Sequence, residues 1–289
     1  MAQVDIDYLK RAKKRRDYSG GAISIILGLF GIFSLWPLLY MFMTAFKPLE
    51  ELMLYPPKFF VMNPTLKNFQ DMVTVTANTT VPFTRYLFNT VLITVVYLFV
   101  MILVATMACY PLSKHNFPGR NFLFSTITIA MMFVTAATSV PSYLIINGLG
   151  LPNTYFAYII PGLANTTGVF LLKQFLDGVP NEIFEAGKID GASEWQLYTK
   201  IAIPLLKNAQ ATIIILSFGG IWGESGVAGS YIYDEQLRTL GWFMGTIGGG
   251  LARTGATTAA GLIMSLPTII MFVVQQTKVM DTMAHSGIK

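Results

Sequence analysis

The sequence contains few of the residues that build a catalytic or metal-binding site. Its 289 residues include one cysteine, Cys109, and two histidines, His115 and His285, so it offers neither a disulfide framework nor a cluster of metal ligands. It contains no HExxH zinc motif, no GxSxG nucleophile turn and no GxxxxGK[ST] phosphate loop. These absences argue against a metalloenzyme, a serine hydrolase and a self-contained ATPase. We therefore expect that the chain is not an enzyme by itself and binds no cofactor or metal.

Charged residues are also scarce. Asp, Glu, Lys and Arg make up 12% of the chain and hydrophobic residues 53%, and the mean hydropathy is +0.55. An average soluble domain has about 25% charged residues. The composition therefore indicates a protein whose surroundings are a lipid bilayer.

Long apolar runs alternate with short polar segments, as in a polytopic membrane protein. A spanning helix needs about 20 mostly apolar residues. Runs of this length occur at residues 21–46, 86–113, 121–172, 209–233 and 254–277, and the run at 209–233 is interrupted only by Glu224. The run at 121–172 is long enough for two helices, which a Gly- and Pro-containing turn at 147–154 would separate. The sequence predicts an all-α protein with six transmembrane helices.

The basic residues predict the orientation of these spans, because Lys and Arg near spanning helices stay on the cytoplasmic side. The segment LKRAKKRR precedes the first span and contains six of them. With both termini cytoplasmic, 14 of the 20 basic residues lie inside. We read residues 1–19 as a basic cytoplasmic N-terminus, 20–283 as the transmembrane domain and 284–289 as a cytoplasmic tail. The basic cluster is interpreted as a topology signal and not as a nucleic-acid site, and the first apolar run as a retained anchor.

The longest predicted inner loop has an unusual sequence for so apolar a chain. Residues 184–206 read FEAGKIDGASEWQLYTKIAIPLL and lie between the fourth and fifth predicted spans. They predict a short helix, a turn around Gly191 and a second helix that begins near Glu194. Trp195 and Tyr198 are spaced to share one apolar stripe with Ile201 and Ala202, and Pro204 would redirect the chain into the next span. The loop is expected to form a compact helix-turn-helix at the membrane surface.

This loop resembles the EAA loop of permease subunits in binding-protein-dependent ABC importers. The similarity rests on Glu185-Ala186, Asp190-Gly191-Ala192, Ile201 and Ile203-Pro204. Gly187 stands where that motif has a second alanine, and Ile203 where it has leucine. The later stretch LSFGGIWGESGVAGSYIYDEQLRTLGWFMGTI is similar to carbohydrate-type permeases, with Gly223 and Ser225 as departures. In length, spans and termini the chain resembles the smaller second permease subunit of maltose-like and multiple-sugar importers.

The resemblance implies a set of partners. A second homologous permease would complete the pore, and two copies of a cytosolic ATPase would bind ATP and Mg. A soluble binding protein would deliver a sugar or oligosaccharide from outside the cell. The EAA loop would dock on the ATPase and transmit its closure to the spans. The residues implied in this ATPase coupling are Glu185, Ala186, Asp190, Gly191, Ala192, Trp195, Tyr198 and Pro204.

Roles within that loop follow from the residue types. Glu185 would offer a charge to a basic residue of the ATPase, and Trp195 with Tyr198 an apolar contact. Gly191 would form the turn. Asp190 has two interpretations, a cap for the helix after Gly191 or a contact with the partner.

Three residues in or near spans are candidate pore or gate residues: Asn165, Trp222 and Glu224. An ionisable group in a span usually faces protein or water, which favours a pore role for Glu224. Alternatively the fifth helix ends at the glycines before Glu224, which is then an ordinary outer-surface carboxylate. The alternative to an ABC permease is a secondary transporter or channel without an ATPase. Such proteins commonly have repeated halves and paired charges at mid-depth, and neither is evident in this sequence.

Overall fold

Helices form all of the regular structure in the residues that the computed structural model describes, which are 2–77, 81–133, 135–247 and 253–286. The all-helical class expected from the sequence is confirmed. Internal contacts divide the chain into two units. The first unit consists of Met1–Met72 and Gly249–Leu262, and the second of Val73–Gly248 and Ile263–Lys289.

Within the described residues, three helices are each long and apolar enough to cross a bilayer. They are α1 (Ala2–Ala45), α4 (Phe83–Lys114) and α15 (Thr254–Ser286). The apolar part of α1 covers 23 residues, and at 1.5 Å per residue it is about 34 Å long, enough for a hydrocarbon core of about 30 Å. These helices coincide with the first, second and last predicted spans.

The apolar run at 121–172, predicted to form two spanning helices, forms four shorter ones. They are α5 (Arg120–Ala130), α6 (Thr135–Gly148), α7 (Phe156–Leu163) and α8 (Thr166–Asp177). The break between α7 and α8 lies at Asn165, where the backbone leaves the helical region and the side-chain oxygen accepts a hydrogen bond of 2.7 Å from the Gly168 N–H. One polar residue in an apolar run does not reveal such a break. The count of six spans therefore stays a prediction.

The turn expected at 147–154 is present and is held by Asn153. This residue has a positive φ of 58°, which asparagine tolerates better than most residues. Its backbone N–H donates to the Tyr231 carbonyl at 2.8 Å. Its side-chain oxygen accepts from the backbone N–H groups of Tyr233, at 3.2 Å, and Asp234, at 2.8 Å.

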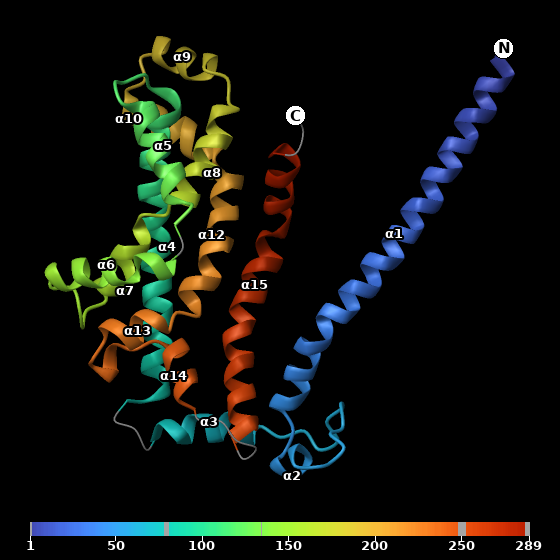
Figure 1. The fold of residues 1–289 in the computed structure, drawn as a ribbon, viewed down its shortest axis with the longest axis vertical. Helices are drawn as coiled ribbons and strands as arrows, with labels where there is room; N and C mark the ends of the chain where they lie inside the picture. The colour runs from blue at the N-terminus through green and yellow to red at the C-terminus, as the bar shows by residue number, and fades with distance from the viewer. Residues whose placement is uncertain (1, 78–80, 134, 248–252, 287–289) are drawn as a thin grey trace. The chain divides into compact units, whose positions relative to one another are not determined.

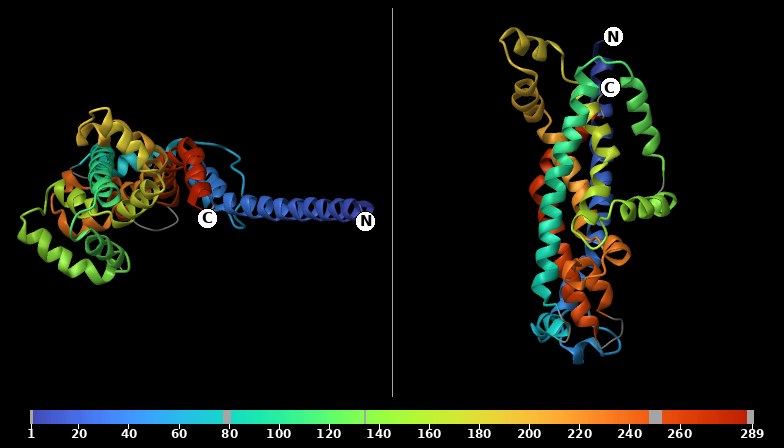
Figure 2. Two further views of the ribbon diagram at one scale, coloured as in Figure 1. Left: turned by 90° about the horizontal axis from the view of Figure 1, so that it is seen from above. Right: turned by 90° about the vertical axis from the view of Figure 1, so that its left-hand side faces the viewer.

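Helix α4 is the centre of the second unit. It packs against α7, α8 and α12 (Lys207–Trp222), and α8 and α12 run beside it in both views (Figures 1 and 2). One side of α4 is buried along its whole length, from Tyr86 through Ile93 and Met101 to Cys109. Tyr97, on the same side, lies so close to Gly162 of α7 that a side chain at Gly162 would meet its ring at 2.5 Å. Close packing of this kind fixes α4 against its neighbours.

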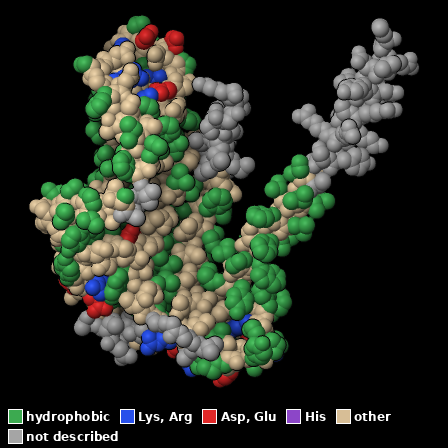
Figure 3. All heavy atoms as spheres, viewed as in Figure 1, with side chains coloured by type: hydrophobic (Ala, Val, Ile, Leu, Met, Phe, Trp, Pro, Cys, Tyr) green, Lys and Arg blue, Asp and Glu red, His purple; other side chains and the backbone are tan. Residues whose placement is uncertain are grey.

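Short helices gather at the two ends of α4. At the Lys114 end lie α9 (Glu182–Ile189), α10 (Glu194–Gln196), the π-helix η1 (Leu197–Ala202) and α11 (Ile203–Leu205), together called the knob (Figure 1). At the Phe83 end lie α13 (Gly226–Tyr231), the 3-10 helix η2 (Glu235–Leu237) and α14 (Leu240–Thr246). In the second unit, charged side chains gather at the knob and again toward the other end, and hydrophobic ones are scattered over the surface between (Figure 3).

The first unit holds part of the connection after the first span. It contains α2 (Leu49–Leu52) and the start of α3 (Lys67–Ala77). The buried Asn68 amide donates to the Ala45 and Lys47 carbonyls at 2.8 and 2.7 Å, which ties α3 to the end of α1. The Glu51 carboxylate accepts from the backbone N–H groups of Met62 and Asn63 at 3.0 and 2.7 Å. The pKa of Glu51 is lowered from its ordinary value, chiefly because the backbone N–H of Met62 donates a hydrogen bond to the ionised carboxylate.

The apolar segment of α1 is exposed within the first unit. None of its most hydrophobic stretch is buried, and large side chains such as Phe30 and Phe33 are 67% and 75% exposed. Hydrophobic side chains stand out along this part of α1 (Figure 3). A helix that is apolar all round is typical of a membrane span. The exposure of this segment is therefore consistent with the lipid surroundings that the composition indicates.

Candidate functional site

The turn of the knob is built around Gly191, as the sequence predicts. Helix α9 ends with Asp190 as its C-cap, and Gly191 has a left-handed φ of 79°. The Gly191 N–H donates to the Lys188 carbonyl and the Ala192 N–H to the Gly187 carbonyl, both at 3.0 Å. These two bonds make a Schellman motif, which closes a helix when a glycine follows its last residue. Gly191 therefore has the left-handed conformation expected for this turn.

The second helix of the knob is capped by Ser193 and not by Asp190. The Ser193 side chain accepts from the Gln196 N–H at 3.3 Å, and the Gln196 side chain accepts from the Ser193 N–H at 2.8 Å. This reciprocal pair is a capping box. The capping interpretation of Asp190 was wrong because the Schellman turn places Gly191 and Ala192 between it and the next helix. The exposed Asp190 keeps the other interpretation, a contact with a partner.

The second helix differs from the regular α-helix that was predicted. Residues 197–202 form a π-helix, in which the turn is wider than in an α-helix. The neighbours Leu197 and Tyr198 are both buried, at 0% and 4% exposure, whereas Trp195 is 62% exposed. The predicted stripe is therefore divided, with Ala202 buried and Ile201 half-buried. The predicted stripe did not include Leu197, which is fully buried beside Tyr198.

Tyr198 is a structural anchor in the second unit. Its hydroxyl forms a hydrogen bond of 2.9 Å with the buried Thr106 hydroxyl of α4. Its ring lies 5.7 Å from that of Tyr110 and 5.4 Å from that of Trp195. The prediction that Tyr198 offers its ring to an ATPase is therefore wrong, and of the two aromatic residues only Trp195 presents a large free surface.

Glu194 joins the knob to the end of α4, which sequence reasoning missed. Its carboxylate lies 2.9 Å from the Lys188 ammonium of α9 and 3.1 Å from the His115 Nε2, and it accepts a bond of 3.0 Å from the Tyr110 hydroxyl. Tyr110 lies 84 residues and His115 79 residues away in sequence. We call Glu194, Lys188, Tyr110 and His115 the Glu194 clasp. Only the opposite charges of Lys188 and Glu194 were visible in the sequence.

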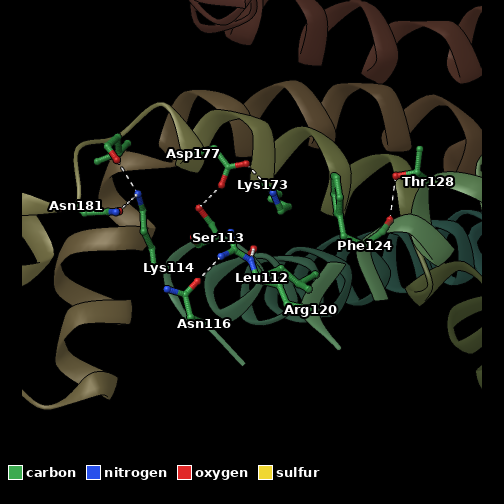
Figure 4. Close-up of polar contacts among 11 residues, drawn as sticks. Leu112, Ser113, Lys114, Asn116, Arg120, Phe124, Thr128, Lys173, Asp177 and Asn181 are labelled. Carbon is green, nitrogen blue, oxygen red and sulfur yellow. Dashed lines mark hydrogen bonds and ion pairs between the residues drawn. The ribbon is translucent and has the colours of Figure 1, made fainter. Parts of the chain in front are cut away.

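A second set of contacts holds the segment that enters the knob. The Ser113 hydroxyl donates to Asp177 at 2.6 Å, and Asp177 also pairs with the nearly buried Lys173 at 2.6 Å (Figure 4). The Lys114 ammonium donates to the Val179 carbonyl at 2.6 Å and to the Asn181 side chain at 3.0 Å. The last turn of α4 is thus bonded to the segment that joins α8 to α9.

The outer face of α9 carries the first part of the predicted motif. Glu185 and Ala186 are exposed there, and Ile189 at the end of the helix is 86% exposed. Gly187 faces inward, where an added Cβ would meet Leu197 at 2.7 Å. The glycine in place of alanine therefore lets α9 approach the π-helix closely. The exposed carboxylate and isoleucine form a surface that suits a protein partner.

Pro204 lies where the knob leads into the next long helix. It is the second residue of α11, which continues the π-helix directly, so its missing N–H removes one backbone donor close to the end of this helical run. The axis of Glu194–Leu205 then bends by 69° into α12. The predicted change of direction near Pro204 is confirmed, and together the two segments have the length and hydropathy of one broken span.

The three candidate pore residues each make separate structural contacts in the second unit. Asn165 caps α8 and donates to the Ser217 hydroxyl at 3.1 Å. Trp222 is buried, and its indole N–H donates to the Met264 carbonyl of α15 at 2.9 Å. These hydrogen bonds give Asn165 and Trp222 a structural role, and the pore role of the two residues remains a prediction.

Glu224 follows the end of α12, as the second of its two interpretations states. The helix ends at Trp222, and the Glu224 side chain accepts from the Val227 N–H of α13 at 2.7 Å. The backbone here forms a tight elbow, because the Thr239 hydroxyl donates to the Glu224 carbonyl at 2.6 Å. An added Cβ at Gly241 would lie only 2.7 and 2.8 Å from the carbonyl oxygens of Gly223 and Glu224.

Comparison with known proteins identifies a family. Residues 101–277 match the model of the binding-protein-dependent transport system inner membrane component. The inner membrane ABC transporter permease protein YcjP of Escherichia coli K12 is 28% identical over 271 residues, which cover 91% of this chain and 94% of that protein. The arabinooligosaccharides transport system permease protein AraQ of Halalkalibacterium halodurans is 25% identical, covering 92% and 95%.

A solved structure shares the fold. It is the crystal structure of a bacterial ABC transporter involved in the import of the acidic polysaccharide alginate. One of its chains superposes with a TM-score of 0.77 at 22% identity and covers 89% of this chain and 95% of its own length. The superposition covers most of this chain, so its overall fold matches one that has been determined by crystallography.

Proposed function

The chain belongs to the family of binding-protein-dependent transport system inner membrane components, and we propose that it forms half of the pore of an ATP-driven sugar importer. It is a multi-pass membrane protein, and its family supplies a transport permease and not a catalytic subunit. A second homologous permease completes the pore. Two copies of a cytosolic ATPase bind the ATP and Mg, so this chain needs no cofactor of its own.

The observation that carries this proposal is the knob. It has the helix-turn-helix form of an EAA loop, with Gly191 in a left-handed turn and with Glu185, Ile189 and Trp195 exposed. Such a surface offers a rigid docking element without a catalytic group. Docked on the ATPase, it transmits the closure of the ATPase dimer to the helices.

The proposed substrate is a sugar or oligosaccharide. Relatives of similar length are named for the transport of arabinooligosaccharides, diacetylchitobiose and sulfoquinovosyl glycerol. A structure with the same fold is described as an alginate transporter in complex with an alginate pentasaccharide-bound periplasmic protein. A binding protein that delivers the sugar to the outer face is therefore part of the proposal.

Copurification and uptake test the function. The chain, purified from its native membranes in mild detergent, is expected to retain an ATPase and a second permease. In proteoliposomes that contain the binding protein, uptake from a panel of labelled arabino-, chito- and alginate oligosaccharides should require ATP inside the vesicle. Uptake that an ion gradient alone sustains, without a bound ATPase, would instead establish the secondary transporter or channel.

The proposed orientation places the knob in the cytosol of a bacterial cell, with both termini on the same side. In a Cys109→Ala background, Ile189→Cys should resist a membrane-impermeant maleimide added to intact cells and react after permeabilisation. Tyr233→Cys, at 65% exposure near the opposite end of α4, is the matched control and should react from outside. Labelling in the reverse pattern would invert the proposed topology.

A further inference from the structure

The last turns of α4 hold the knob on both sides of its turn. Before α9, Ser113 bonds Asp177, and Lys114 bonds Val179 and Asn181. These contacts fix the chain as it leaves α8. None of these residues belongs to the exposed surface that the knob would present to a partner.

After the turn, side chains of α4 and of His115, the residue that follows it, hold α10 and the π-helix. Tyr110 and His115 bind Glu194 at 3.0 and 3.1 Å, and Thr106 binds Tyr198 at 2.9 Å. Thr106, Tyr110 and Ser113 are spaced by four and three residues, so they lie on one face of α4. One helical face thus contacts both the segment that enters the knob and the segment that leaves it.

The knob is also joined to itself across the turn. Lys188 of α9 pairs with Glu194 of α10 at 2.9 Å, so the same carboxylate binds the first helix of the knob and α4. Beneath this pair, the Phe184 ring lies 6.1 Å from the Tyr110 ring, and the Lys114 ammonium lies 5.1 Å from the Phe184 ring. Glu194 is therefore the group at which α9, α10 and α4 meet.

We infer that Glu194 is a positioning residue for coupling, which locks the knob and α4 into one rigid body. A knob joined to the rest only through its chain ends would pivot when an ATPase pulls on it. With the Glu194 clasp closed, the displacement is delivered directly to α4 and, through α4, to the helices packed on it. This inference rests on the proposed function, because the displacement comes from the ATPase.

A distance measurement tests the rigid body. Spin labels are placed at Ile183→Cys, 42% exposed, on α9 of the knob and at Met107→Cys, 49% exposed, on α4, in a Cys109→Ala background. Pulsed EPR is recorded on the purified complex with its ATPase, first without nucleotide and then after trapping with ATP, Mg and vanadate. We expect the same distance distribution in both states. In Glu194→Ala, trapping should shift the distance by about 2 Å or more and broaden the distribution, while ATP hydrolysis continues.

Matched variants separate the clasp from general damage. Tyr110→Phe keeps the ring that packs on Phe184 and Tyr198 and removes one hydroxyl, so it should fold normally and shift in the same direction as Glu194→Ala. Glu182→Gln removes an exposed carboxylate of α9 and should behave like the wild type.

Two outcomes overturn the inference. One is a distance that changes on trapping in the otherwise wild-type chain, and the other is a distance that stays constant in both Glu194→Ala and Tyr110→Phe. Absence of any ATPase from the purified complex, or of trapped nucleotide, is a separate result. That result would contradict the proposed function, and it would therefore also contradict the inference about Glu194.

Discussion

Gly191→Val uncouples ATP hydrolysis from transport in the reconstituted importer while the chain still inserts in the membrane. Gly191 has a φ of 79°, and no atom lies within 4 Å of the position that its Cβ would occupy. The added Cβ therefore meets no neighbouring atom, and the expected effect is backbone strain. A left-handed conformation costs an ordinary L-residue about 1–2 kcal/mol, and a β-branched residue is disfavoured there most strongly. The turn relaxes, and α9 and α10 leave the geometry that docks.

The measurement is ATP-dependent uptake together with ATP hydrolysis that the loaded binding protein stimulates. Gly191→Asn is the matched control, since asparagine tolerates the left-handed region and should keep most of the activity. Glu185→Ala should have the smaller effect, because an exposed ion pair is usually worth about 1 kcal/mol or less. If Gly191→Val assembles and transports like the wild type, the knob is not the coupling element.

Gly241→Ala severely destabilises the protein, whereas Gly245→Ala in the same short helix does not. The Cβ at residue 241 would lie 2.7 Å from the Gly223 carbonyl oxygen and 2.8 Å from that of Glu224. These are backbone atoms, which cannot rotate away as a side chain does. The elbow between α12 and α13 must open, and the Thr239 bond to Glu224 is strained or lost. Overpacking of this kind typically costs about 1–3 kcal/mol and occasionally more.

Thermal unfolding of the purified chains in detergent compares the two variants. Gly245 has no atom within 4 Å of its Cβ position, so alanine there should be neutral or stabilising through its better helix propensity, by up to about 1 kcal/mol. We expect a lower midpoint and lower membrane yield for Gly241→Ala and a midpoint at or above the wild-type value for Gly245→Ala. Equal midpoints in the two variants would show that the elbow yields easily.

The sequence predicted the features that depend on local composition. A long apolar run forms a long helix in α1, α4 and α15, and glycine in a short polar loop gave the turn at Gly191. It failed where the answer depends on partners distant in sequence. Tyr198 has the type and spacing of a surface aromatic residue, and only its contact with Thr106, 92 residues away, shows that it is buried.

Two further features were out of reach of pattern analysis. The apolar run at 121–172 contains Pro141 and Pro161, yet both lie inside helices, and the break between α7 and α8 falls instead at Asn165, where a side-chain cap replaces helical bonds. The Glu194 clasp needs Tyr110 of α4 and His115 just after it, and no sequence periodicity relates these residues to Glu194. Hydropathy identifies which segments are apolar, but tertiary contacts decide where those segments break and what holds the loop between them.

The bend of 69° between the knob and α12 makes a lever. Helix α12 has 16 residues and is about 24 Å long at 1.5 Å per residue. At this inclination its far end lies about 22 Å from the axis of the preceding segment, given the same rise per residue. A rotation of about 10° around that axis then moves the far end by about 4 Å, which is two-thirds or more of one helical pitch. A small rotation of the knob would thus move the other end of α12 sideways, by an amount that the length of α12 sets.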